Sequence, residues 1–216
     1  MPGTIGRQLL RLAGEAGALT FAVAAAGRIL EGPLGGFPRE AGVNRWLVQR
    51  RTPVGDRLSW AVSTYSDTVP TIVLACAVAM LRWRRGRDPL HASLPVAAIA
   101  LETAVFMSAA AMVGRARPDV ARLDRPAPTS SFPSGHTGAS TALHLVLADG
   151  LAGSGCRGGR PTAFLVRALV PPAVGWSRLY RGMHHPTDVA VGLLVGAWAG
   201  GAVRRVAARA GEYETC

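Results

Sequence analysis

Apolar stretches alternate with short polar breaks along the whole chain of 216 residues. A helix that crosses a bilayer needs about 20 mostly apolar residues, and fewer where long side chains anchor its ends. The pattern therefore predicts an all-α, polytopic membrane bundle of about six transmembrane helices, with residues 1–216 forming a single domain. The predicted spans are residues 15–30, 58–81, 90–113, 136–152, 161–176 and 186–203.

The first of these stretches has two interpretations. Its uninterrupted apolar part runs only from Ala16 to Gly27, it follows Arg7 and Arg11, and residues 24–26 are small. Such features are typical of a secretory signal peptide as well as of a short span. We favour a retained helix, and the alternative leaves five spans with the orientation of the others unchanged.

The distribution of charge predicts how the chain lies in the membrane. The net charge of +11 comes from arginine alone. A basic chain can bind nucleic acid, but these arginines gather at the ends of apolar runs, which indicates topology signals and contacts to anionic lipid, and no nucleic acid partner. By the positive-inside rule we expect a plasma-membrane protein with both termini cytoplasmic. The cytoplasmic breaks hold Arg7, Arg11, Arg82, Arg84, Arg85, Arg87, Arg157, Arg160, Arg204, Arg205 and Arg209.

The opposite side also carries arginines, against the same rule. Residues 31–57 contain five of them. We expect part of this segment to be an amphipathic helix on the outer surface, with Trp46 and Leu47 dipping into the membrane.

Three segments on this outer side contain the residues that can do chemistry. They are residues 114–118 (GRARP), 133–136 (PSGH) and 177–188 (SRLYRGMHHPTD). Arginine forks match phosphate oxygens in pairs and stay charged. The start of a helix after the second segment would offer free N–H groups to an anion. These are the parts of a phosphate cradle that needs no metal.

The third segment also predicts a nucleophile. His184 and Asp188 are four residues apart, and Pro186 suits the first turn of a helix. Asp188 could then turn back to one imidazole nitrogen and leave the other free to attack phosphorus. On another helix, His136 would be free to protonate the leaving oxygen.

These segments resemble the three-part signature of the type 2 phosphatidic acid phosphatase superfamily, Lys-x6-Arg-Pro, Pro-Ser-Gly-His and Ser-Arg-x5-His-x3-Asp. The second part matches in full at residues 133–136, and the third matches in full within residues 177–188. The first part matches only at Arg117 and Pro118, because Ala110 stands at the lysine position. The three parts lie within residues 110–188.

The resemblance implies a six-helix membrane fold and metal-independent hydrolysis through a phosphohistidine, without a cofactor. By that resemblance His184 is the nucleophile, His136 the general acid and Asp188 the partner of the nucleophile. The residues that bind phosphate are then Arg117, Arg178, Ser134 and Gly135.

Two further charged residues need an interpretation. Our hypothesis is that Arg115 supplies the positive charge that the lysine position lacks. Glu102 lies deep inside a predicted span, where an ionisable residue indicates function by default, although a structural role is about as common.

The sequence therefore predicts a phosphatase that acts on a membrane lipid phosphate or diphosphate at the extracytoplasmic face. Undecaprenyl diphosphate suits an outward-facing site in a bacterium, and phosphatidate, phosphatidylglycerol phosphate and diacylglycerol diphosphate compete with it. One alternative is a lipid-linked phosphotransferase of the same fold. Another is a transporter or scaffold with a degenerate site, for which the only support is Ala110.

Overall fold

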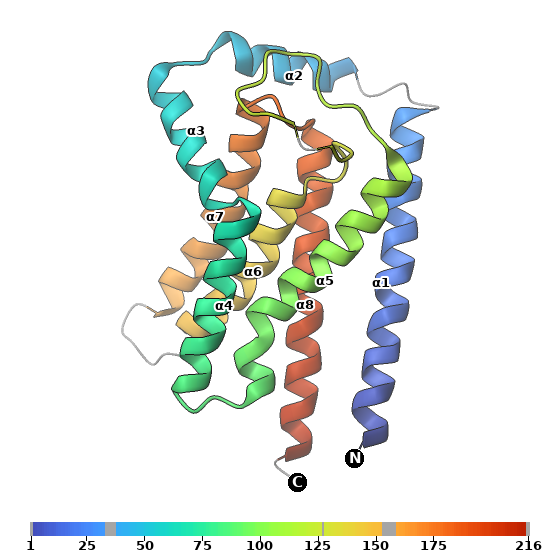
Figure 1. Cartoon of the computed structure of the whole chain (residues 1–216), viewed down its shortest axis with the longest axis vertical. Coiled ribbons are helices and arrows are strands. Elements are labelled where there is room, and N and C mark those ends of the chain that lie inside the picture. The colour runs from blue at the N-terminus through green and yellow to red at the C-terminus, as the bar shows by residue number, and fades with distance from the viewer. Residues whose placement is uncertain (1, 33–37, 127, 153–158, 215–216) are drawn as a thin grey trace.

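The computed structural model describes residues 2–32, 38–126, 128–152 and 159–214. These residues form eight helices, with no strand among them (Figure 1). The helices are α1 (Pro2–Glu31), α2 (Pro38–Gln49), α3 (Pro53–Tyr65), α4 (Thr68–Arg84), α5 (Pro89–Val113), α6 (Gly135–Ala152), α7 (Gly159–Tyr180) and α8 (Pro186–Glu214).

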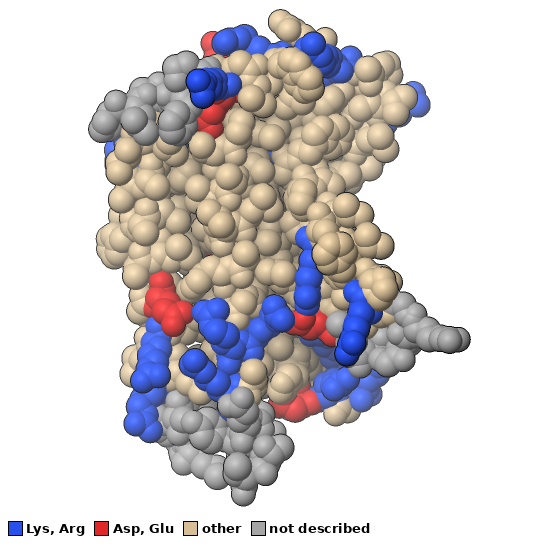
Figure 2. Space-filling view, turned by 180° about the vertical axis from the view of Figure 1, so that it is seen from behind, with Lys and Arg blue, Asp and Glu red and all other residues tan. Residues whose placement is uncertain are grey.

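The long helices run side by side between two opposite ends of the molecule (Figure 1). The chain begins and ends at one of them. At the other end, α2 lies across the bundle, close to the long connection from α5 to α6 and to the turn between α7 and α8. In Figure 2 the charged side chains gather at the two ends and leave a broad uncharged band between them, as expected of a protein that crosses a bilayer.

The all-helical membrane architecture is confirmed, whereas the predicted count of six spans is not. Length and composition identify α1, α5 and α8 as spans, and the pair α3 and α4 as a fourth if it is counted as one broken span. The predicted fourth and fifth spans are the helices α6 and α7. The apolar stretch of α7 is interrupted by the charge of Arg167 and by the rings of Pro171 and Pro172.

The predicted span over residues 58–81 is not one continuous helix. The chain bends by 52° between α3 and α4. Asp67 at the break has an extended backbone, and the Ser66 hydroxyl donates to the Ser63 carbonyl at 2.9 Å. Short polar side chains compete with helical hydrogen bonding in this way, so the polar run at residues 63–68 ends one helix and begins the next.

Part of residues 31–57 is the expected surface helix, α2. Trp46 is 52% exposed, whereas Leu47 is buried inside the protein instead of pointing outward. Arg50 stacks on the Trp46 ring, and Arg51 donates two hydrogen bonds to the Tyr180 carbonyl at 2.7 and 3.0 Å. Part of the unexpected positive charge is thus used within the protein.

Helix α1 packs as a member of the bundle. Val23, Ala24 and Leu30 share a buried cluster with residues of α5 and α8. Gly27 lies so close to α5 that a Cβ there would come within 2.7 Å of the Val113 side chain. These contacts favour a retained helix over a signal peptide.

Helix α8 approaches α6 through a row of small residues, Gly192, Gly196 and Gly200. Spacing by four places them on one face, which lets two membrane helices come close together. A Cβ at Gly196 would lie 2.2 Å from the Gly138 carbonyl oxygen. Because that atom belongs to the backbone, only a shift of a whole helix could make room.

We therefore expect Gly196→Ala to destabilise the bundle by about 1–3 kcal/mol through overpacking. Thermal unfolding in detergent should show a fall in Tm of roughly 2–10 °C. Gly14→Ala is the matched control, since nothing lies within 4 Å of a Cβ there. Equal Tm values for the two variants would refute the proposed close contact.

Candidate active site

The three chemistry-bearing segments meet at one cavity of about 700 Å³ near the α2 end of the bundle. Its wall comes from α3, α4, α5, α6 and α7, from the α5–α6 connection and from the turn before α8. Of the predicted site residues, Gly135, His136, Arg117, Arg178 and His184 line it. Ser134, Asp188 and Arg115 are buried behind that wall.

His184 is buried in the turn between α7 and α8. Its Nδ1 lies 2.7 Å from the Ser131 carbonyl oxygen and 3.6 Å from Oδ2 of Asp188. A carbonyl can only accept, so Nδ1 carries the proton and Nε2 keeps its lone pair. Asp188 therefore lies near the ring as expected, but at an ion-pair distance that is too long for a hydrogen bond. The Ser131 carbonyl, which accepts the Nδ1 proton, sets the tautomer.

Burial lowers the pKa of His184 to about 4, against the opposing effect of Asp188. The ring is therefore neutral near pH 7, as a nucleophile must be. The unfolded chain, with an ordinary histidine pKa near 6.5, binds this proton more readily than the folded protein does between pH 4 and 6.5.

This difference predicts a pH dependence of stability. The contribution of His184 is complete above about pH 6.5 and is lost as the pH falls toward 4. Relative to His184→Asn, which does not titrate, the wild type should lose up to about 3 kcal/mol over that range. Unfolding in detergent at several pH values measures it, and a constant difference between the two proteins would contradict the lowered pKa.

Asp188 joins the second and third segments. Its carboxylate accepts hydrogen bonds from the Ser131 hydroxyl, from the His185 N–H at 2.7 Å and from Arg115 at 2.6 Å. Its own carbonyl accepts from the Ser134 N–H at 2.9 Å. The side chain is fully buried, so these donors replace water around the charge.

Arg115 binds protein groups through all three of its guanidinium nitrogens. Its guanidinium donates to Asp188, to Glu40 of α2 at 2.8 Å, to Glu31 of α1 at 3.1 Å and to the Thr187 hydroxyl at 2.7 Å. Burial would lower its pKa, but Asp188 and Glu40 outweigh that effect and raise it. The structure thus places Arg115 behind Asp188 and away from the cavity, where the hypothesis of a direct phosphate contact finds no geometric support.

Two of the predicted phosphate-binding arginines, Arg117 and Arg178, do reach the cavity. Arg178 donates to the Ser63 hydroxyl at 2.5 Å and to Asp124 at 3.2 Å, and Arg117 donates to the Met183 carbonyl at 2.8 Å. Asp124 also binds Arg181 through both carboxylate oxygens. These contacts fix the two guanidinium groups beside His184, where their remaining donors can meet an anion.

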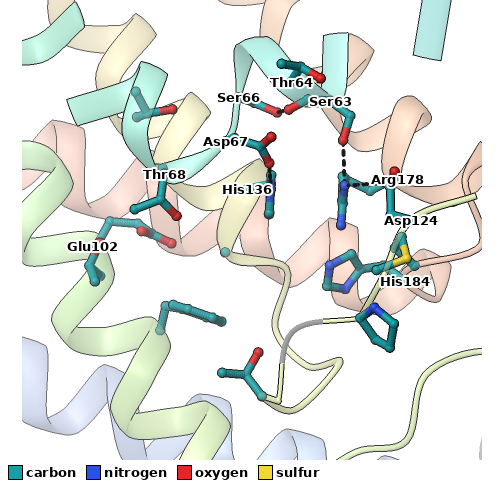
Figure 3. Close-up of a pocket in the computed structure, with 18 of the residues that line it drawn as sticks. Ser63, Thr64, Ser66, Asp67, Thr68, Glu102, Asp124, His136, Arg178 and His184 are labelled. Carbon is teal, nitrogen blue, oxygen red and sulfur yellow. Dashed lines mark hydrogen bonds and ion pairs between the residues drawn. The ribbon is translucent and has the colours of Figure 1, made fainter. Parts of the chain in front are cut away.

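His136 lies in the first turn of α6, with its Nε2 2.8 Å from Oδ1 of Asp67 (Figure 3). Asp67 comes from the break between α3 and α4, and Ser63 comes from the last turn of α3. The break therefore brings polar partners to both His136 and Arg178.

The sequence analysis missed these partners, as well as two residues of α2. Asn44 donates to the His184 carbonyl at 3.0 Å, and Glu40 accepts from the Thr187 N–H at 2.7 Å. A signal existed for Asp67, because an aspartate between Ser66 and Thr68 is typical of a helix start. No sequence signal connects α2 to a turn about 140 residues later.

Among the described residues, no group of three or more His, Cys, Asp or Glu side chains could hold a metal ion. What the cavity offers is one neutral imidazole, a second imidazole beside a carboxylate, two arginine forks and a helix N-terminus. This set can bind a tetrahedral anion and exchange a substituent on it.

Comparison with known proteins agrees with this geometry. The model of the PAP2 superfamily matches residues 91–212, more than half of the chain. The decaprenylphosphoryl-5-phosphoribose phosphatase of Mycobacterium tuberculosis, from two strains, is 33% identical over 139 residues, which are 62% of this chain and 70% of that protein.

Solved structures share the fold. A transmembrane PAP2-type phosphatidylglycerolphosphate phosphatase from Bacillus subtilis superposes with a TM-score of 0.74 at 20% identity, over 90% of this chain and 95% of that one. Aquifex aeolicus LpxE superposes with a TM-score of 0.63 at 24% identity, over 78% of this chain and 96% of that one.

Proposed function

This chain belongs to the PAP2 superfamily and is a membrane lipid phosphatase, and on that basis we propose that it hydrolyses a lipid phosphate through a phosphohistidine on His184. The observation that carries the proposal is the buried, neutral imidazole of His184, which lines the same cavity as Arg117 and Arg178. The polyprenyl-linked substrate of the mycobacterial relative favours a polyprenyl carrier over phosphatidate as the lipid.

In the first step, Nε2 of His184 attacks phosphorus and the bond from phosphorus to the leaving oxygen breaks. When the His136 imidazole carries a proton, it gives that proton to the leaving oxygen, and Asp67 holds the ring in place. In the second step, His136, now neutral, takes a proton from water as the water oxygen attacks the phosphohistidine. Phosphate leaves, and both histidines return to their starting states.

Negative charge on the equatorial oxygens is stabilised by Arg117, by Arg178 and by N–H groups of the first turn of α6. Position 135 favours glycine because a Cβ there would lie 2.9 Å from the Phe106 ring. The backbone at the start of α6 can thus remain close to the cavity.

We assign the active site to the extracytoplasmic face and both termini to the cytoplasm. The arginines at the end with the termini follow the positive-inside rule. Many of those at the other end form hydrogen bonds within the protein and need no anionic lipid there: Arg51, Arg115, Arg117, Arg178 and Arg181.

The test is phosphate release by the purified protein in detergent with EDTA. The substrates are a polyprenyl diphosphate, phosphatidate, phosphatidylglycerol phosphate and a soluble aryl phosphate. Release that persists in EDTA supports the metal-independent mechanism. Loss of activity in EDTA that a divalent ion restores would overturn it, and transfer of phosphate to an added alcohol in preference to water would favour a phosphotransferase.

Arg125 is our candidate for the positive charge that Ala110 cannot supply. It lines the cavity next to Asp124, and its side chain is exposed. Ala110 is buried in α5. We expect Arg125→Ala to raise KM about 10-fold, the cost of one charge-assisted contact.

Arg122→Ala is the matched control for that variant. Arg122 belongs to the same connection and is exposed, but it does not line the cavity. Steady-state kinetics on one lipid phosphate compare the two variants. If both KM values stay at that of the wild type, Arg125 does not replace the lysine.

A further inference from the structure

Glu102 is a buried carboxyl group that the mechanism above does not use. It lies in the middle of α5, is 1% exposed and lines the active-site cavity (Figure 3). It has a side-chain hydrogen bond with Thr103. In the described part of the chain, no arginine or histidine forms an ion pair with it.

The fold makes room for this carboxyl group. A Cβ at Gly138 of α6 would lie 2.0 Å from Oε1 of Glu102, so only glycine there allows the side chain its position. A polar group that is buried in a membrane protein without a full set of partners is expensive. Leucine would avoid that cost, so the retained carboxyl group points to a ligand that completes its hydrogen bonding.

The opposite wall of the cavity is rich in hydroxyl groups. Thr68, in the first turn of α4, faces Glu102 in Figure 3, and Thr64 and Ser66 line the cavity nearby. Ile72 and Met107 line it as well, and both are exposed. Hydroxyl groups thus line the cavity beside Glu102, next to apolar side chains such as Ile99 and Phe106.

This polar part lies beside the phosphate-binding end of α6. Gly135 and His136 begin α6, and Gly138, which touches Glu102, is one turn further, about 5 Å along the helix. Figure 3 draws His136 between His184 and Glu102, so a substrate whose phosphorus lies at His184 would reach Glu102 with the part of its head group that extends past His136.

We propose, on the basis of the function above, that Glu102, Thr68 and Thr103 form a second subsite that binds hydroxyl groups of the substrate head group. A carboxyl group accepts a hydrogen bond from a hydroxyl in either protonation state, and threonine can both donate and accept. An alkyl chain in this place would leave the carboxyl group unsatisfied. The substrate class is thus a phosphorylated sugar or polyol joined to a lipid, and not phosphatidate or a simple polyprenyl diphosphate.

The experiment compares two probes that differ only in hydroxyl groups. They are a short-chain prenylphosphoryl-5-phosphoribose and its 2,3-dideoxy analogue, with phosphate release measured in detergent. The wild type should have a kcat/KM about 10- to 100-fold higher for the hydroxylated probe, because the site rejects an analogue that leaves its polar groups unpaired.

Glu102→Leu should remove that preference by lowering kcat/KM for the hydroxylated probe, with the dideoxy value within about 3-fold of the wild type. Glu102→Gln keeps a hydrogen-bond acceptor and adds a donor, so this variant should retain most of the preference for the hydroxylated probe. Thr68→Val removes a hydroxyl group from the opposite wall. Because Thr68 is exposed, this variant should fold even if Glu102→Leu does not, and the test then still gives a result. Thermal unfolding of each variant checks the fold.

Equal kcat/KM values of the wild type for the two probes would overturn the inference. An equal loss on both probes in Glu102→Leu would also overturn it, since that is the result of a structural role. Failure to release phosphate from any lipid would instead refute the proposed function. Release without discrimination refutes the second subsite alone.

Discussion

Replacing His184 by alanine should lower kcat by roughly 10⁴-fold or more, with little change in KM. In the proposed mechanism no other group forms the bond to phosphorus, whereas Arg117 and Arg178 continue to bind the phosphate. Steady-state phosphate release measures the loss. With a radiolabelled substrate and rapid acid-free quenching, the wild type should also yield a labelled protein, and the variant should not.

His185→Ala is the matched control. This neighbour has the same ring, but it does not line the cavity, and the carboxylate of Asp188 bonds to its main-chain N–H, which the substitution leaves in place. We expect a change in kcat of less than about 10-fold. Comparable losses in the two variants would mean that the turn has been disturbed, and a His184→Ala protein with wild-type activity would refute the nucleophile.

Arg115→Ala should cause the second large effect, and it should be a loss of both stability and turnover. The substitution leaves Asp188 and Glu40 buried without their cation, a situation that costs about 3–5 kcal/mol in proteins. With Asp188 no longer held, the His184 ring loses its alignment, and kcat should fall about 100-fold, the effect of a misplacement of about 1 Å.

Two measurements separate this positioning role from a direct contact with phosphate. A phosphate ligand would change the inhibition constant of orthophosphate and leave Tm unchanged. We expect the reverse, with a large fall in Tm and near-constant inhibition by orthophosphate in the protein that remains folded. Arg122→Ala, which removes only a bond to the Pro118 carbonyl, should leave both quantities unchanged.

The parts of this molecule that could be predicted are those encoded over short distances. The apolar runs predict the helices, and the spacing of His184 and Asp188 across the start of α8 predicts their proximity, because four residues are one helical turn. The residues 133–136 likewise come directly before or within the first turn of α6. The structure brings these motif residues together, while their chemical roles stay predictions.

The parts that could not be predicted depend on contacts between distant segments. Asn44 bonds to a carbonyl 140 residues away, and Arg115 binds three carboxylates, of which Glu31 and Glu40 precede it by 84 and 75 residues. The sequence suggested that Arg115 binds phosphate only because of its charge. Glu31 and Glu40 are too far away along the chain to be recognised as its partners. The break at Asp67 was hidden because the apolar residues on both sides together reach the length of a span.

The two hydrogen-bonding functions of Asp188 have a consequence for protein engineering. Its carboxylate serves His184, Ser131 and Arg115, whereas its carbonyl holds the Ser134 N–H. A carbonyl belongs to the main chain and survives every substitution, so Asp188→Asn would alter the charge at the nucleophile while the two motifs remain tied together. The side chain and the main chain of residue 188 thus contribute separately: a substitution there changes the charge beside the nucleophile and weakens the hold on Arg115, but it leaves the link between the two motifs in place.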